Sequence, residues 1–120
     1  MGYNIFKKYF FEEYKRTEFN KKVTIENFGS LLHPILGPGF SGSCIPPTQN
    51  SKGSALMVYD LGKRGIVLFH SSLEFNPTKK FDYSDYADSY IKKIHIHTKG
   101  PITDDTSTKQ KLDSILEQFI

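Results

Sequence analysis

The sequence has no tryptophan, one cysteine and no long run of apolar residues. The single cysteine, Cys44, cannot form an intramolecular disulfide, and it cannot supply a zinc site built from several cysteines. No segment reaches the roughly 20 apolar residues of a membrane-spanning helix. Charged residues interrupt the apolar N-terminal residues, unlike the core of a signal peptide. We therefore expect a cytoplasmic protein without a membrane segment.

A large excess of one charge is also missing. The chain has 16 Lys and Arg residues against 13 Asp and Glu residues, and the formal net charge of +3 is spread along it. A nucleic-acid-binding domain usually gathers its positive charge on one face or tail. The segment 7–16 (KKYFFEEYKR) does interleave basic and aromatic residues, as single-strand binders do, but two glutamates interrupt it. A small nucleic-acid-binding protein is therefore an alternative and not our first prediction.

The residues that are present suit a single domain over 1–120. Hydrophobic residues make up 38% of the chain and aromatic residues 14%, which is enough for one core. The clearest local signal is a β-hairpin at about 54–72, where SALMVYDL and IVLFHSS flank the turn GKRG. A second signal is the apolar stripe at helical spacing over 107–120. With Ser107 and Gln110 as a capping box, it predicts a helix there.

Weaker patterns complete the predicted fold. Apolar residues at helical spacing predict helices at 4–16 and 82–94, and short alternating patterns predict strands at 22–26 and 94–97. Together, these elements predict an α+β domain with a small antiparallel sheet and the hairpin at its centre. The N-terminal helix, the 82–94 helix and the C-terminal helix are expected to pack on one side of this sheet.

Two segments are predicted to be irregular. Pro34 interrupts the apolar segment 28–36, so we do not expect a long helix there. The segment 37–53 is rich in glycine and proline, and we expect it to be a long loop. Loops of this length are often functional, which makes the glycines at its start of interest.

Gly37, Gly39 and Gly42 match the pattern G-x-G-x-x-G of dinucleotide-binding loops. Such a loop holds phosphate at the N-terminus of the helix that follows it. Here Pro46 and Pro47 follow, and they are incompatible with a helix at that position. We therefore predict a bend that uses the positive φ angles available to glycine, and we predict no cofactor.

The reactive side chains form no recognisable catalytic set. Cys44 could act as a nucleophile with a histidine as its base, but GSCIP resembles no hydrolase signature. His95 and His97 would share one face of a strand, where a metal ion would need a third ligand such as His70. We predict no enzyme, no metal site and no catalytic residue. A small cysteine-dependent hydrolase using Cys44 and a histidine is the second alternative.

These observations favour a non-catalytic protein-binding domain that occludes a macromolecular partner. Abundant tyrosines and a long loop are typical of protein interfaces. Immunity proteins that neutralise a cognate toxin, for example in contact-dependent growth inhibition, are small bacterial proteins of this kind, and we expect this chain to be one. A mildly basic chain does not mimic nucleic acid, so the partner is expected to offer an acidic or mixed surface. The oligomeric state is left open, and the expected contact residues are Phe11, Phe40, Tyr83, Tyr86, Tyr90, His95 and His97.

Overall fold

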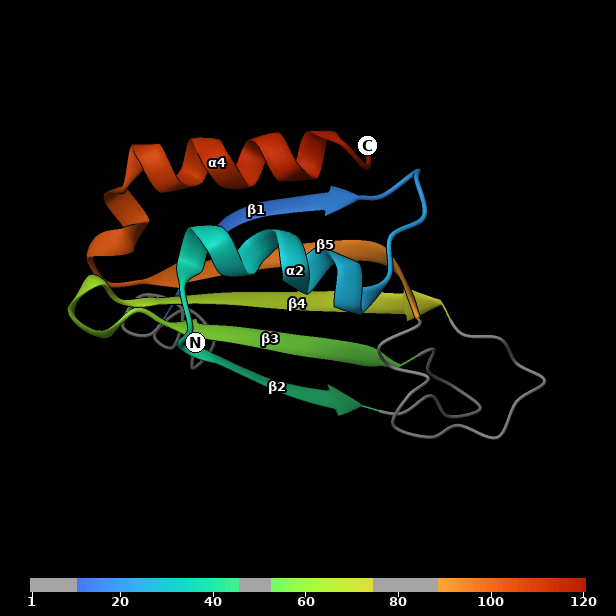
Figure 1. Cartoon of the computed structure of the whole chain (residues 1–120), viewed down its shortest axis with the longest axis horizontal. Coiled ribbons are helices and arrows are strands. Elements are labelled where there is room, and N and C mark those ends of the chain that lie inside the picture. The colour runs from blue at the N-terminus through green and yellow to red at the C-terminus, as the bar shows by residue number, and fades with distance from the viewer. Residues whose placement is uncertain (1–10, 46–52, 75–88) are drawn as a thin grey trace, which may run out of the picture.

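The computed structural model describes residues 11–45, 53–74 and 89–120. These residues form one antiparallel sheet of five strands in the order β1-β5-β4-β3-β2, together with two α-helices (Figure 1). The predicted α+β class with an antiparallel sheet is therefore confirmed. The strands are β1 (Glu12–Glu18), β2 (Phe40–Ile45), β3 (Ser54–Asp60), β4 (Ile66–Glu74) and β5 (Tyr90–Lys99), and the helices are α2 (Ile25–Leu36) and α4 (Thr106–Glu117).

The predicted hairpin is confirmed as the pair β3 and β4. The two strands pair from Asp60 opposite Ile66 to Ser54 opposite Ser72. A short 3-10 turn, η1 (Gly62–Arg64), joins them. Buried residues alternate with exposed or half-buried ones along both strands, so each strand buries one of its faces. Because β4 also pairs with β5 and β3 with β2, the hairpin lies inside the sheet.

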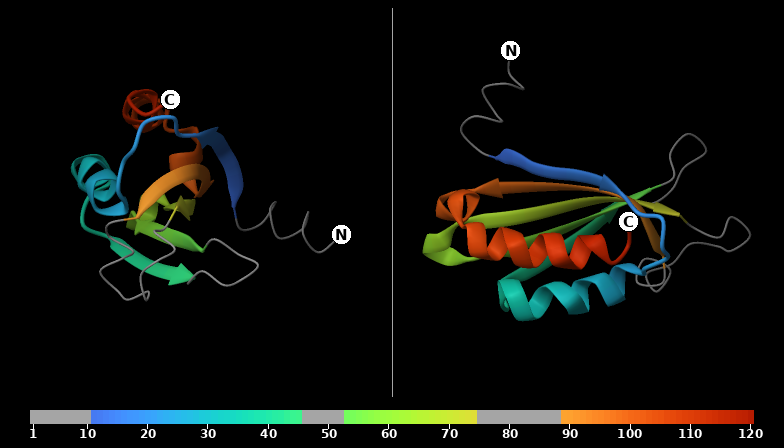
Figure 2. Two further views of the ribbon diagram at one scale, coloured as in Figure 1. Left: turned by 90° about the vertical axis from the view of Figure 1, so that its right-hand side faces the viewer. Right: turned by 90° about the horizontal axis from the view of Figure 1, so that it is seen from above.

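Both helices lie on the same face of the sheet, which we call the helix face (Figure 2). The core between the helices and the sheet contains a continuous series of aromatic rings. The centroids of neighbouring rings are 5.5 to 6.1 Å apart. Most of these neighbours meet edge to face, the arrangement that aromatic quadrupoles favour. The series is Phe119, Phe19, Phe28, Phe69 and Tyr59, and it runs from the end of the chain to β3.

The predicted C-terminal helix is confirmed as α4, but its cap differs from the prediction. Asp105, and not Ser107, is the N-cap. The Asp105 carboxylate accepts hydrogen bonds from the backbone N–H of Thr108 at 3.1 Å and from its hydroxyl at 3.0 Å. These bonds lower the pKa of Asp105. Within the described ranges, no helix is long and apolar enough to cross a membrane.

The predicted strand at 22–26 is wrong, because this segment contains the start of α2. Thr24 is the N-cap, and its hydroxyl accepts a hydrogen bond from the Asn27 N–H at 3.2 Å. Thr24 contributes only an isolated bridge to Tyr90 at the sheet. The side chain of Thr24 satisfies a backbone donor of the first turn, which favours the helix over a strand at this position.

The expectation that Pro34 prevents a helix over 28–36 is also wrong. α2 continues through Pro34 and ends at Leu36. A proline inside a helix removes one backbone hydrogen bond and costs roughly 3 kcal/mol. The helix buries Phe28, Leu32 and Leu36 against the sheet, and each such side chain contributes about 1.5 to 3 kcal/mol. Burial of this face therefore outweighs the local cost of the proline.

Two predicted helices are strands where the structure describes them. Residues 12–16 lie in β1 and residues 90–94 lie in β5, and these two strands pair with each other. The residues 4–10 and 82–88 of these predictions lie outside the described residues. In both segments a strand alternation coexists with the helical spacing, and pairing with a distant strand decides between them. The strand predicted at 94–97 is confirmed as part of β5.

The segment 37–53 is not one irregular loop, because Phe40–Ile45 forms the edge strand β2. β2 pairs with β3 along its whole length, from Phe40 opposite Tyr59 to Ile45 opposite Ser54. Residues 46–52 lie outside the described residues. The propensity of glycine and serine does not favour a strand, so pairing with β3 determines this element.

Candidate functional site

The face of the sheet opposite the helices, which we call the open face, carries no helix of the described ranges (Figure 2). Its side chains alternate along each strand with the buried side chains of the helix face. The centre of the open face is aliphatic. Val58 lies opposite Leu68, with Leu56 and Ile66 on the same two strands. All four side chains are half-buried, so the open face presents apolar surface at its centre.

Three histidines lie next to this aliphatic centre. His70 of β4 is directly opposite His95 of β5, and their ring centroids are 6.3 Å apart. His97 lies two residues further along the same strand face and stacks with His95 at 6.4 Å. The prediction that His95 and His97 share one strand face is therefore confirmed. His70 was not expected among the contact residues, although the alternation of IVLFHSS places it on the face opposite Val67 and Phe69.

Two charged residues of β1 border the histidines. Glu13 Oε1 lies 3.6 Å from His95 Nδ1 and 3.2 Å from the Arg16 guanidinium. Burial and the positive charge of Arg16 lower the pKa of His95, and the negative charge of Glu13 offsets them only in part. Because the ordinary histidine pKa is about 6.5, the His95 imidazole is mainly uncharged at neutral pH.

The charged residues of the open face are balanced. Glu18 of β1 is directly opposite Lys93 of β5. Lys99 of β5 and Asp60 of β3 lie on either side of Ile66 of β4. Binding to phosphates requires positive charge in excess, gathered on one surface. The described part of the open face does not have such an excess. Its acidic residues are Glu13, Glu18, Asp60 and Glu74, and its basic residues are Arg16, Lys93, Lys99 and Lys92, whose Nζ lies 3.1 Å from Glu74 Oε2.

Within 11–45, 53–74 and 89–120, no group of three or more His, Cys, Asp or Glu side chains is arranged to hold a metal ion. Cys44 lies in β2 opposite Ala55. Its side chain is outside the part of the chain that the structure describes, so the cysteine-dependent hydrolase stays a prediction.

Phe40 lies apart from the histidines, on the helix face at the start of β2. Its side chain is 45% exposed, and its ring centroid is 5.3 Å from those of both His33 and Tyr59. The Tyr59 hydroxyl and His33 Nδ1 are 3.0 Å apart and form a hydrogen bond. Burial raises the pKa of Tyr59 to about 12. Phe40 therefore belongs to an aromatic group that joins α2 to the edge of the sheet.

Of the other expected contact residues, Tyr90 lies on the open face at the opposite end of β5 from His97, because it alternates with buried Ile91 and is opposite exposed Glu74. Tyr90 begins β5, is 37% exposed, and has Lys22 Nζ 5.2 Å from its ring centroid. Phe11 precedes β1 and is half-buried. Tyr83 and Tyr86 lie outside the described residues. The structure thus groups His95 and His97, places Tyr90 at the other end of the same strand, and places Phe40 on the helix face.

The glycines at 37, 39 and 42 have structural roles. Gly37 ends α2 with a positive φ of 83°, so the predicted bend is confirmed at this residue. A Cβ atom on Gly39 would lie 2.0 Å from the Asp60 carbonyl oxygen, so only glycine fits there. Gly42 is part of β2. The segment therefore continues into a strand and not into the helix that a phosphate-binding loop needs.

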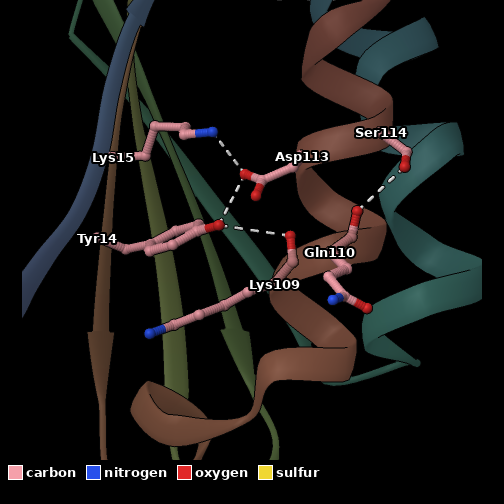
Figure 3. A network of polar contacts seen from close by, with 6 residues as sticks. All are labelled: Tyr14, Lys15, Lys109, Gln110, Asp113 and Ser114. Carbon is pink, nitrogen blue, oxygen red and sulfur yellow. Dashed lines mark hydrogen bonds and ion pairs between the residues drawn. The ribbon is translucent and has the colours of Figure 1, made fainter.

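β1 is fixed to α4 by a group of polar contacts (Figure 3). Tyr14 donates a 2.7 Å hydrogen bond to Asp113 Oδ1, and Lys15 Nζ lies 2.6 Å from the same oxygen. Lys109 Nζ lies 4.9 Å from the centre of the Tyr14 ring, within the range of a cation–π contact. Burial and the bond to Asp113 raise the pKa of Tyr14. Burial opposes ionisation of Asp113, but the hydrogen bonds from Lys15 and Tyr14 outweigh it and lower the pKa of Asp113.

No family model, curated protein or solved structure matches this chain. The chemistry and geometry of the open face are therefore the basis for a functional proposal. Its defining features are the aliphatic centre, the row of histidines and the balanced charges on β1, β5 and the end of β3.

Proposed function

We propose that the chain is a non-catalytic protein-binding domain and that the open face contacts the partner. The observation that carries this proposal is the half-buried aliphatic centre on a sheet face that carries no described helix. Apolar surface bordered by polar residues is typical of sites where proteins bind each other. The imidazole rings add flat side chains that combine apolar contact with hydrogen bonding. The aliphatic centre consists of Leu56, Val58, Ile66 and Leu68, and the rings are those of His70, His95 and His97.

The balanced charges support a protein partner over a nucleic acid. Each phosphate contact requires a cation, and affinity for nucleic acid rises with the number of such contacts. On the open face, Arg16 lies beside Glu13 and Lys93 lies opposite Glu18. The lowered pKa of His95 keeps a further positive charge from this surface at neutral pH.

A narrower form of the proposal is a bacterial, cytoplasmic immunity protein that neutralises a cognate toxin. A sheet face suits such a role because it can cover a catalytic site without entering it. The partner would need an apolar patch to match the aliphatic centre and a mixed charge pattern to match β1 and β5. Catalysis by the chain itself is not required for this function.

The direct test is co-expression with the C-terminal domain of a large secreted protein encoded beside this gene. Bacterial growth and complex formation on gel filtration are the readouts. We expect the domain to arrest growth when expressed alone, and the chain to restore growth and to co-elute with it. A folded chain that neither binds nor protects would overturn the toxin-neutralising proposal. Binding to an oligonucleotide that weakens steeply as salt rises would favour the nucleic-acid alternative.

Matched variants test whether the open face is the contact surface. Leu68→Glu places a charge in the aliphatic centre, whereas Leu31→Glu places the same charge on α2, where Leu31 is 36% exposed. We expect the first variant to weaken partner binding by about tenfold or more, since central apolar contacts dominate interfaces. The second should bind as the parent does. His70→Ala, at an exposed position, gives a milder open-face variant if Leu68→Glu disturbs folding.

A further inference from the structure

The edge strand β2 directs part of its backbone away from the sheet. Its neighbour among the described strands is β3, on one side only (Figure 1). The Asp60 N–H donates to the Gly39 carbonyl at 2.8 Å, so Gly39 and Asp60 are a hydrogen-bonded pair at the start of the β2–β3 ladder. Hydrogen-bonded and non-hydrogen-bonded pairs alternate in an antiparallel ladder. The backbone N–H and C=O groups of Phe40, Gly42 and Cys44 therefore point outward.

Two of these three residues offer both a donor and an acceptor at the edge. The Phe40 N–H already donates to the Pro38 carbonyl at 2.8 Å. Gly42 and Cys44 lie one residue on either side of Ser43, and no described strand pairs with this side of β2. Unpaired edge groups in this arrangement are a template for another strand.

β2 also lacks the features that protect other edge strands from pairing. Its sequence FSGSCI contains no charged residue and no proline. The opposite edge, β1, reads EEYKRTE and has a register shift between Glu13 and Lys15. Charges and bulges are the usual protection of an exposed edge. Only one of the two edges of the described sheet is therefore protected in this way.

We propose that two copies of the chain pair through β2, antiparallel, about a two-fold axis at Ser43. In an antiparallel pair, directly opposite side chains point to the same face of the sheet. Residue i therefore cannot lie opposite residue i+1 of the second copy, and the two-fold axis must pass between two copies of the same residue. An axis at Ser43 places Gly42 of each copy opposite Cys44 of the other. Each of these pairs can exchange both backbone hydrogen bonds, and neither pair needs the occupied N–H of Phe40.

A second copy fits this edge better than a foreign strand for two reasons. Gly42 and Cys44, whose outward backbone groups meet no described strand, lie symmetrically about Ser43, so the strand is complementary to itself. The strand is uncharged, so self-pairing brings no like charges together at the axis. Figure 1 shows neither α2 nor α4 lying over β2, so the helices leave room for the second sheet. The two sheets would join into one, with all helices on the same face.

A charge exchange at the axis tests the proposal. Ser43→Lys and Ser43→Glu each place like charges opposite each other in a pair centred at this residue. By sedimentation velocity, we expect the parent to form dimers as its concentration rises and each variant alone to be monomeric. An equimolar mixture of the two variants should form dimers again, because opposite charges then meet at the axis. Ser43 is exposed, so neither variant should disturb the fold, and circular dichroism checks this.

Ser41→Lys is the matched control. With the axis at Ser43, residue 41 is opposite residue 45 of the second copy, so two lysines do not meet and the dimer should persist. Amide hydrogen exchange at Gly42 and Cys44 should slow as protein concentration rises. A parent that stays monomeric, a Ser43→Lys variant that still dimerises, or a mixture that does not would each overturn the proposal. The dimer uses the edge of the sheet and the proposed partner contact uses the open face, so either can fail alone.

Discussion

β1 and β2 are the two outer strands of the same sheet, and they are held in place by different interactions. β1 is mostly charged, and the side chains of Tyr14 and Lys15 attach it to Asp113 of α4. β2 is uncharged, and its start is held by the close approach of Gly39 to the Asp60 backbone. A charged edge strand is protected against further pairing, whereas an uncharged one held by its backbone and the Phe40 ring keeps its outer side available.

The largest effect is expected from Gly39→Ala, which breaks the attachment of β2. The added Cβ would meet the Asp60 carbonyl oxygen, a backbone atom that cannot move aside without disturbing the ladder. We expect a loss of roughly 2 to 4 kcal/mol in the free energy of unfolding, measured by urea denaturation.

Gly37→Ala is the control for this prediction. Gly37 has a positive φ, which Gly39 does not, but a Cβ there has nothing within 4 Å, so only backbone strain of about 1 kcal/mol is expected. Equal losses for the two variants would show that the close approach at Gly39 does not hold β2.

A smaller effect is expected from Asp113→Ala, which breaks the attachment of β1. The substitution removes the acceptor of both Tyr14 and Lys15. Because the site is partly exposed, we expect a loss of about 1 to 2 kcal/mol. Asp104→Ala, at an exposed carboxylate near the start of α4, should change stability by less than about 0.5 kcal/mol.

The same carboxylate predicts a pH dependence. The pKa of Asp113 is lower in the folded protein than its ordinary value of about 4. Its contribution is therefore present above that ordinary value and is lost as pH falls through the lower folded pKa. The unfolding free energy of Asp113→Asn should fall less steeply in acid than that of the parent. Parallel curves for the two proteins would contradict this role.

The smallest effects come from removing one hydroxyl on the edge strand β1 and one on β3, the neighbour of the other edge, and they sharpen the comparison. Tyr14→Phe removes a hydrogen bond to a carboxylate, and Tyr59→Phe removes one to the His33 imidazole. Bonds to charged groups are stronger, so we expect losses of about 1 to 1.5 kcal/mol for Tyr14→Phe and about 0.5 to 1 kcal/mol for Tyr59→Phe. Thermal unfolding monitored by circular dichroism would compare them. A larger loss for Tyr59→Phe would mean that burial, and not charge, sets the strength of these bonds.

The elements predicted correctly from the sequence are those specified by nearby residues. The hairpin of β3 and β4 is closed by a short turn, and α4 has its own apolar stripe. β1 and β5 were predicted as helices in part, because their partners lie far away in the chain and local spacing does not reveal them. α2 was missed because the local cost of Pro34 was visible, whereas the burial of Phe28 and Leu32 was not.

The candidate site shows the same limit. The two-residue spacing of His95 and His97 was enough to place them on one strand face. The approach of His70 depends on how β4 is aligned with β5, and that of Glu13 depends on the alignment of β1 with β5. Neither register is encoded by the short segments themselves. The open face could therefore be recognised only once the strand order was known.

The strand order has a consequence for how the chain folds. The strands β2, β3 and β4 each pair with the next described strand along the chain, whereas β1 pairs with β5 across most of the sequence. Closing the longer loop costs more conformational entropy, so we expect β1 to dock after the other four strands have assembled. Contacts formed that late lie beyond the rate-limiting barrier. Loss of the link between Tyr14 and Asp113 would then speed unfolding and leave the rate of folding almost unchanged.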